Sequence, residues 1–186
     1  MNWLIELDQQ FFLWLNSHHA SWLDGPMLLI TGRNTWIPLY LALIAWLIYQ
    51  QKKEAAWSIL AIVLTIVIAD QLTSGLMKPF FERLRPCHDP AIASLVHLVD
   101  GCGGKFGFAS SHAANTFALA TFVSLLHTGK AYWHFVWYAW AAIVTYSRIY
   151  VGVHYPGDVL VGALVGIAAA YIIYLLGRKT GRLKHV

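Results

Sequence analysis

Charged residues are scarce in this chain of 186 residues: Asp, Glu, Lys and Arg together make up 12% of it. An average soluble domain has about 25%. Hydrophobic residues account for 58% and aromatic residues for 15% of the chain. This composition excludes a disordered chain, a coiled coil and a basic nucleic-acid-binding tail. It predicts a protein that crosses a membrane several times, with no nucleic-acid partner.

Cysteine is also nearly absent, since the chain contains two. Two Cys exclude a disulfide-dense scaffold and a four-Cys zinc site. The spacing of His88, Asp89, His97 and Asp100 matches no standard metal site, so we expect no metal. The sequence has no internal repeat and no low-complexity tract, which predicts a single membrane-embedded domain over residues 1–186.

Long apolar segments predict an all-α fold, a polytopic bundle of about five transmembrane helices. A membrane-spanning helix needs roughly 20 mostly apolar residues. The five candidate segments are 26–50, 55–77, 110–127, 132–150 and 156–177. Gly25-Pro26 is interpreted as the start signal of the first. Residues 2–17 have apolar side chains at helical spacing but include Glu6 and Asp8, which predicts an N-terminal helix lying in the interface.

The positions of Lys and Arg predict how the bundle is oriented. The predicted inner side has Lys52, Lys53, Lys130, Arg178, Lys179, Arg182 and Lys184. The other side has Arg33, Lys78, Arg83, Arg85, Lys105 and Arg148. If Lys78, Arg85 and Arg148 serve a site, the remaining bias puts the C-terminus in the cytoplasm and the N-terminus outside. We interpret Arg33, Arg83 and Lys105 as cations that extend to the interface.

Three polar clusters interrupt the apolar background, at residues 78–86, 108–112 and 147–158. Each lies at the predicted outer end of a span, and antiparallel spans bring such ends to one membrane face. Cations at that depth are costly unless they are paired or functional. Lys78, Arg85 and Arg148 suit a phosphate, whose oxygens accept bidentate Arg contacts and a Lys charge. Ser110 and Ser111 occupy the expected start of a helix, where free N–H groups bind anions.

Two histidines in these clusters suit phosphoryl chemistry. His112 and His154 can titrate near neutral pH. Asp158 follows His154 by four residues, so a helical turn would bring its carboxylate beside the imidazole. A carboxylate on one ring nitrogen fixes the tautomer and leaves the other nitrogen free to attack. Asp70, within a predicted span, is either a buried hydrogen-bonding acid or a partner of Lys78 on the same helix face.

These clusters resemble the motifs of the type 2 phosphatidic acid phosphatase superfamily, which includes integral-membrane lipid phosphatases. Its motifs KxxxxxxRP, PSGH and SRxxxxxHxxxD correspond here to Lys78…Arg85-Pro86, Ala109-Ser110-Ser111-His112 and Ser147-Arg148…His154…Asp158. The chain departs from the second motif at Ala109 and Ser111. The motif-bearing core with its spans covers residues 55–177.

The resemblance implies a role for each matching residue. His154 would attack phosphorus and form a phosphohistidine, and Asp158 would orient it. His112 would protonate the leaving oxygen and later activate water. The phosphoryl oxygens would be held by Lys78, Arg85, Arg148, Ser110 and Ser111. The resemblance implies no cofactor and no metal.

The resemblance also implies a substrate class and a location. The chain looks most similar to bacterial undecaprenyl-diphosphate phosphatases, so undecaprenyl diphosphate is the favoured substrate. Phosphatidylglycerophosphate, phosphatidate and the phosphates of lipid A stay open. The expected location is the bacterial cytoplasmic (inner) membrane, with the site on the periplasmic or extracellular face. Oligomeric state is left open.

Three other functions compete with this interpretation. A lipid phosphotransferase would pass the phosphoryl group to another lipid instead of water. Vanadate-dependent haloperoxidases are similar in all three motifs but are soluble, and five predicted spans argue against them. A non-enzymatic lipid transporter would usually have repeated halves and broken helices, and the sequence indicates neither.

The two cysteines, Cys87 and Cys102, are predicted to form a disulfide. Both belong to the same predicted outer loop and lie in polar, Gly-rich sequence rather than in apolar runs. Disulfides persist on the outer side of the membrane. The bond would restrain the loop between Arg85 and Ser110, two predicted parts of the phosphate site.

Overall fold

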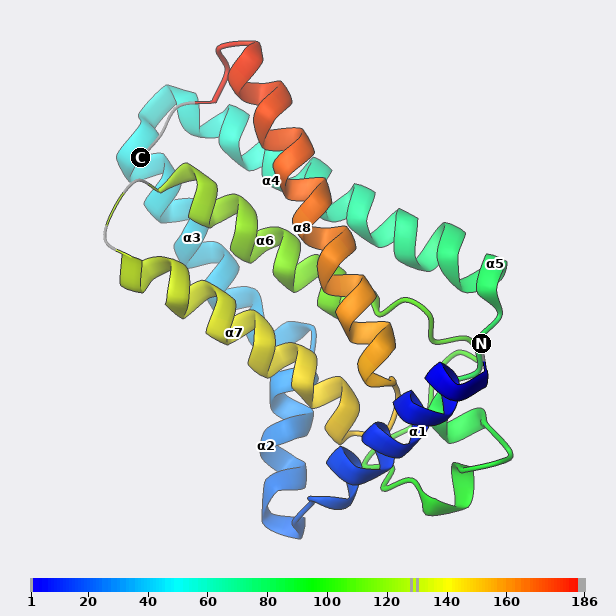
Figure 1. Cartoon of the computed structure of the whole chain (residues 1–186). Coiled ribbons are helices and arrows are strands. Elements are labelled where there is room, and N and C mark those ends of the chain that lie inside the picture. The colour runs from blue at the N-terminus through cyan, green and yellow to red at the C-terminus, as the bar shows by residue number, and fades with distance from the viewer. Residues whose placement is uncertain (1, 128, 130, 184–186) are drawn as a thin grey trace.

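The computed structural model describes residues 2–127, 129 and 131–183, and within them the fold is a helical bundle (Figure 1). Lys130 and Lys184, used in the predicted orientation, lie outside the described residues. The helices are α1 (Asn2–Ser17), α2 (Ser21–Thr31), α3 (Ile37–Gln51), α4 (Ala55–Asp70), the π-helix η3 (Gln71–Met77), α5 (Lys78–Phe81), α6 (Ser111–Leu126), α7 (Ala131–Tyr150) and α8 (Pro156–Lys179). The all-α prediction is confirmed.

The first predicted span is wrong in one respect, because it is two helices. Pro26 does not start a helix but lies inside α2, where it removes one backbone hydrogen bond. Gly32 then adopts an extended conformation, and the chain resumes as α3 after a short turn. The Trp36 indole donates to the Ile30 carbonyl at 2.8 Å, which satisfies one of the acceptors freed where α2 ends.

Helix α6 is the centre of the bundle and packs against α8, α7 and α4 (Figure 1). Gly162 and Gly166 of α8 lie at its contact with α6. A Cβ on Gly162 would meet the Ser110 carbonyl, and one on Gly166 would meet the Ala114 carbonyl. Because both positions lack a side chain, the backbones of α6 and α8 come close together. This contact holds the start of α8 against the start of α6.

The outer helices present apolar side chains away from the bundle. Leu64 and Val67 on α4 and Leu164 on α8 are all exposed. Two described helical stretches, Asn34–Phe81 and Pro156–Lys179, are long and apolar enough to cross a membrane. An apolar outer surface of this kind is stable in lipid and not in water.

One end of the bundle is covered by α1 and the segment 82–110, as Figure 1 shows. Phe12 of α1 is fully buried and makes an edge contact with the Tyr155 ring. The buried Asn16 amide donates to the carbonyls of Ile149 and Tyr150. Helix α1 is therefore fastened to the junction of α7 and α8, where the third polar cluster lies.

Candidate functional site

A cavity of about 610 Å³ opens at the end of the bundle that α1 covers. Side chains from all three polar clusters line it. They are Lys78, Arg85, Ser111, His112, Arg148 and His154. Segments up to 76 residues apart, from Lys78 to His154, thus meet at one place, as the antiparallel arrangement of spans predicts. The volume exceeds what a phosphate needs and is in the usual range for pockets that enclose an organic ligand.

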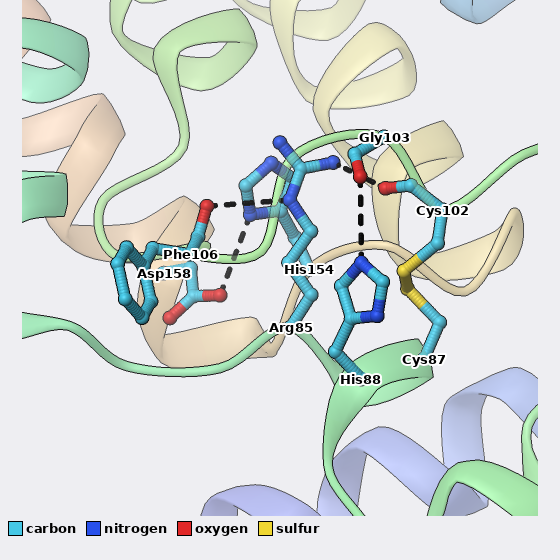
Figure 2. The surroundings of a disulfide bond; sticks show 8 residues. All are labelled: Arg85, Cys87, His88, Cys102, Gly103, Phe106, His154 and Asp158. Carbon is cyan, nitrogen blue, oxygen red and sulfur yellow. Dashed lines mark hydrogen bonds and ion pairs between the residues drawn. A yellow bond between two sulfur atoms is a disulfide. The ribbon is translucent and has the colours of Figure 1, made fainter.

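His154 and Asp158 form a buried pair at the start of α8. Pro156 occupies the first helical turn, and the helical spacing brings Asp158 Oδ2 to 3.3 Å from His154 Nδ1. The Tyr155 N–H donates to the same oxygen at 3.1 Å. A carboxylate at Nδ1 keeps the proton on that nitrogen, so Nε2 carries the lone pair. The pair therefore offers a nucleophilic nitrogen beside the cavity (Figure 2).

The surroundings of His154 favour its neutral form. The residue lies in the connection between α7 and α8 and is 2% exposed. Burial lowers the pKa of the imidazole well below its usual range, and the positive charges of Arg148 and Arg85 lower it further. A neutral imidazole is the form that can attack phosphorus.

Arg85 is held by the backbone of the covering loop (Figure 2). Its Nη1 donates to the Cys102 carbonyl at 2.8 Å, and its Nε donates to the Phe106 carbonyl at 3.3 Å. Cys87 and Cys102 form a disulfide in the structure, with Cα atoms 6.0 Å apart. The bond joins the two sides of the loop: one side contains Arg85, and the other contains the carbonyl of Cys102 that accepts from it. The direction of the guanidinium therefore depends on the loop being closed.

Lys78 and Arg148 approach the cavity from two other elements. Lys78 Nζ donates to Ser111 Oγ at 2.9 Å, and Ser111 Oγ also lies 2.6 Å from Ser74 Oγ. Arg148 donates from Nη1 to Thr31 Oγ1, while its buried Nε has no hydrogen-bond partner among the described residues. An unused buried donor is costly unless a ligand satisfies it. Arg33, interpreted from the sequence as an interfacial cation, is exposed but also lines the cavity, so four cations surround it. Such a set of cations can hold a tetrahedral anion.

Ser110 and Ser111, predicted together as phosphate ligands, differ in position. Ser111 lines the cavity, whereas Ser110 does not. Ser110 is the N-cap residue of α6, but its N–H donates to the Asp158 carbonyl at 2.9 Å and its buried Oγ has no partner among the described residues. The Ser110 N–H thus links the starts of α6 and α8 and is already occupied.

His112 and Asp70 line the same cavity from α6 and α4. His112 lies within the first turn of α6 and is hydrogen-bonded to the Thr31 backbone. Asp70 is half-buried and accepts a hydrogen bond from Asn115 Nδ2 at 3.1 Å, so the hydrogen-bonding part of the first predicted possibility is confirmed. No ion pair joins Asp70 to Lys78 in the part of the chain that the structure describes.

The interpretation of Arg83 as an interfacial cation is wrong. Its Nη1 lies 2.9 Å from Asp158 Oδ1, and its Nη2 lies 2.7 Å from Asp8 Oδ2. A basic residue near a span end usually extends to the interface, and no local signal in the sequence distinguishes this one. Its acidic partners are 75 residues away on either side, so only the tertiary structure identifies them.

Among the described residues, no group of three or more His, Cys, Asp or Glu side chains is arranged to hold a metal ion. The positive charges at the cavity are instead those of Lys and Arg side chains.

A helical membrane bundle with a His–Asp pair and several cations around one cavity defines a class of membrane enzymes that act on phosphate esters. Residues 59–182 match the PAP2 superfamily, and the chain belongs to it. It is a membrane-associated lipid phosphatase.

Several relatives of known activity are similar to this chain over most of its length. The lipid A 4'-phosphatase of Porphyromonas gingivalis is 39% identical over 94% of this chain and 74% of its own length. The lipid A 4'-phosphatase of Bacteroides thetaiotaomicron is 37% identical over 99% of this chain and 83% of its own. The undecaprenyl-diphosphatase of Sulfolobus acidocaldarius is 28% identical over 98% and 84%, respectively.

Solved structures show the same architecture. The crystal structure of Aquifex aeolicus LpxE has a TM-score of 0.67 and 28% identity, over 89% of this chain and 93% of that one. A transmembrane PAP2-type phosphatidylglycerolphosphate phosphatase of Bacillus subtilis has a TM-score of 0.73 at 22% identity, over 96% and 88%. The second of these supports the fold alone.

Proposed function

We propose that this enzyme removes the 4'-phosphate from a lipid A-type glycolipid. The observation that carries the proposal is the similarity of almost the whole chain to two lipid A 4'-phosphatases, at 39% and 37% identity. The undecaprenyl-diphosphatase relative is 28% identical. Undecaprenyl diphosphate, favoured from sequence alone, therefore becomes the second candidate substrate.

In the proposed mechanism, His154 Nε2 attacks phosphorus. The new P–N bond forms as the P–O bond to the sugar breaks, and His112 gives a proton to the departing sugar oxygen. Lys78, Arg85 and Arg148 bind the three equatorial oxygens and stabilise their charge in the transition state. His112 then accepts a proton from water, whose oxygen attacks phosphorus and breaks the P–N bond. Inorganic phosphate leaves, and His154 is regenerated.

The same proposal includes a location and a domain organisation. The enzyme forms one domain over residues 1–186, with its catalytic core in 55–177. It lies in a bacterial cytoplasmic membrane with the cavity on the outer face and the C-terminus in the cytoplasm. The support is the placement, at the end of the bundle opposite α1, of the turn between α3 and α4, which contains Lys52 and Lys53, and of the C-terminal end of α8, which contains Arg178 and Lys179 (Figure 1).

The test is a panel of purified substrates in detergent, with inorganic phosphate as the readout. The panel contains bis-phosphorylated lipid A, undecaprenyl diphosphate, phosphatidylglycerophosphate and phosphatidate. We expect the highest kcat/KM for lipid A, with loss of the 4'-phosphate by mass spectrometry. A higher value for undecaprenyl diphosphate would overturn the substrate assignment.

Two variants test the mechanism on whichever substrate is fastest. His154→Ala and His112→Ala should each abolish turnover while leaving the folded protein in the membrane. Phosphate release equal to the lipid consumed distinguishes hydrolysis from transfer to a second lipid. Activity near that of the wild type in either variant contradicts the two-histidine mechanism.

A further inference from the structure

We propose that Asp8 and Arg83 are positioning residues that hold the Asp158 carboxylate against His154 and so make catalysis depend on helix α1. The proposal rests on the proposed roles of His154 and Asp158. Its basis is a bridging guanidinium. Arg83 Nη1 donates to Asp158 Oδ1 at 2.9 Å, and Nη2 donates to Asp8 Oδ2 at 2.7 Å.

Both oxygens of the Asp158 carboxylate accept hydrogen bonds, and each has different donors. Oδ2 accepts from His154 Nδ1 and from the Tyr155 N–H. Among the described side chains, Arg83 is the one that donates a hydrogen bond to Oδ1. Asp158 is fully buried, so without Arg83 its Oδ1 would be a buried, unpaired oxygen. The orientation of the carboxylate toward His154 thus depends on Arg83.

Asp8 fixes the other side of this arrangement. Its Oδ2 binds Arg83, while its Oδ1 accepts the Gly157 N–H at 2.8 Å. That N–H belongs to the first turn of α8, where backbone donors lack partners within the helix. A Cβ on Gly157 would lie 2.6 Å from Asp8 Oδ2, so the missing side chain is what allows α1 to approach. One carboxylate thereby ties α1 to both Arg83 and the start of α8.

The charge balance gives Asp8 an effect on the reaction. With Asp8 present, the one positive charge of Arg83 is shared between two carboxylates. The group Asp8, Arg83 and Asp158 then keeps a net negative charge, which offsets part of the positive field of Arg148 and Arg85 at His154 and stabilises the imidazole as it becomes cationic during attack on phosphorus. Without Asp8, Arg83 would neutralise Asp158 alone and weaken this stabilisation.

Neighbouring contacts keep Arg83 in place. The guanidinium lies over the Tyr155 ring, 4.1 Å from its centroid. The Tyr155 hydroxyl donates to Asp89 at 2.8 Å, and Gln9 of α1 donates to the same Asp89 oxygen at 2.9 Å. Two successive residues of α1 therefore contact the shell that surrounds the His–Asp pair.

The experiment compares Asp8→Asn, Arg83→Gln and the double variant with a matched control, Glu6→Gln. Glu6 is an exposed acid on the same helix. We expect Asp8→Asn to lower kcat by about 10- to 100-fold, with a change in KM of less than about threefold, the loss typical of a hydrogen bond between charged groups. Glu6→Gln should match the wild type. The double variant should be little worse than Arg83→Gln, because both changes break one linkage.

The contrary outcomes separate this proposal from the proposed function. Wild-type kcat in Asp8→Asn, beside an inactive His154→Ala, overturns the positioning role alone. The positioning role is also overturned if the kcat losses of the two single variants add up in the double variant. It is overturned as well if the loss of activity is an increase in KM together with a lower melting temperature, because Asp8 then acts only in folding. An active His154→Ala overturns the nucleophile and the positioning role together.

Discussion

Asp158 combines burial with complete hydrogen bonding, which is unusual for a carboxylate inside an apolar bundle. It is fully buried, and it accepts from His154, Tyr155 and Arg83. A buried carboxylate is tolerated here because both of its oxygens accept hydrogen bonds. The same contacts give the imidazole one tautomer and one orientation.

Asp158→Asn is therefore expected to lower kcat by roughly 10²–10⁴, as removal of an orienting carboxylate does in a catalytic triad. The amide can direct its NH₂ group at Nδ1 and favour the wrong tautomer. The matched control is Glu82→Gln, an exposed acid next to Arg83 in sequence. Initial rates of phosphate release measure both, and a decrease of less than fivefold in Asp158→Asn would contradict the orienting role.

Vanadate should inhibit the enzyme and EDTA should not. Vanadate adopts the five-coordinate geometry of phosphorus in the transition state, and Lys78, Arg85 and Arg148 can bind its oxygens. Because side-chain cations line the cavity, chelation is expected to leave kcat unchanged. Activity lost in EDTA and restored by a divalent ion would refute the metal-independent mechanism.

The loop that closes the cavity acts as one element because the Cys87–Cys102 disulfide joins its two sides. Arg85 lies two residues before Cys87, and its guanidinium donates to the Cys102 carbonyl. The cavity-lining Arg85 and its acceptor are thus kept close together by a covalent bond (Figure 2).

Replacement of both cysteines by serine should lower stability and weaken substrate binding. The bond closes a loop with a separation of 15 residues. The chain-entropy model assigns about 3 kcal/mol to a loop of this size. We expect a lower melting temperature and a KM raised several-fold, because Arg85 loses a fixed acceptor. Treatment of the wild type with a reductant should reproduce both effects, and an unchanged KM would show that the loop orders Arg85 without the bond.

The bundle as a whole has its chemistry at one end and its basic turns at the other. The cavity is lined by residues 100–104 of the loop and by the connection between α2 and α3. The turn between α3 and α4, which contains Lys52 and Lys53, and the C-terminal end of α8, which contains Arg178 and Lys179, lie at the far end (Figure 1). This separation predicts an outer active site under the positive-inside rule.

Labelling of single cysteines in intact cells tests this orientation, after Cys87 and Cys102 are replaced by serine. Gly104→Cys should react with an impermeant thiol reagent, and Lys53→Cys should react only after the membrane is permeabilised. Both positions are exposed, and a Cβ on Gly104 meets no atom within 4 Å. The opposite labelling pattern would place the cavity in the cytoplasm.

The sequence by itself determined the helical membrane bundle, because long apolar segments have few other stable structures in lipid. It also determined the group Lys78, Arg85, His112, Arg148 and His154, because these residue types at these spacings are costly in a membrane unless they share a task.

Only the tertiary structure decided the break at Gly32, the hydrogen bond between Asp70 and Asn115, and the linkage from Asp8 through Arg83 to Asp158. The reason is physical. Spacing along one helix fixes which side chains share a face, whereas a contact between residues 75 positions apart depends on how the helices pack.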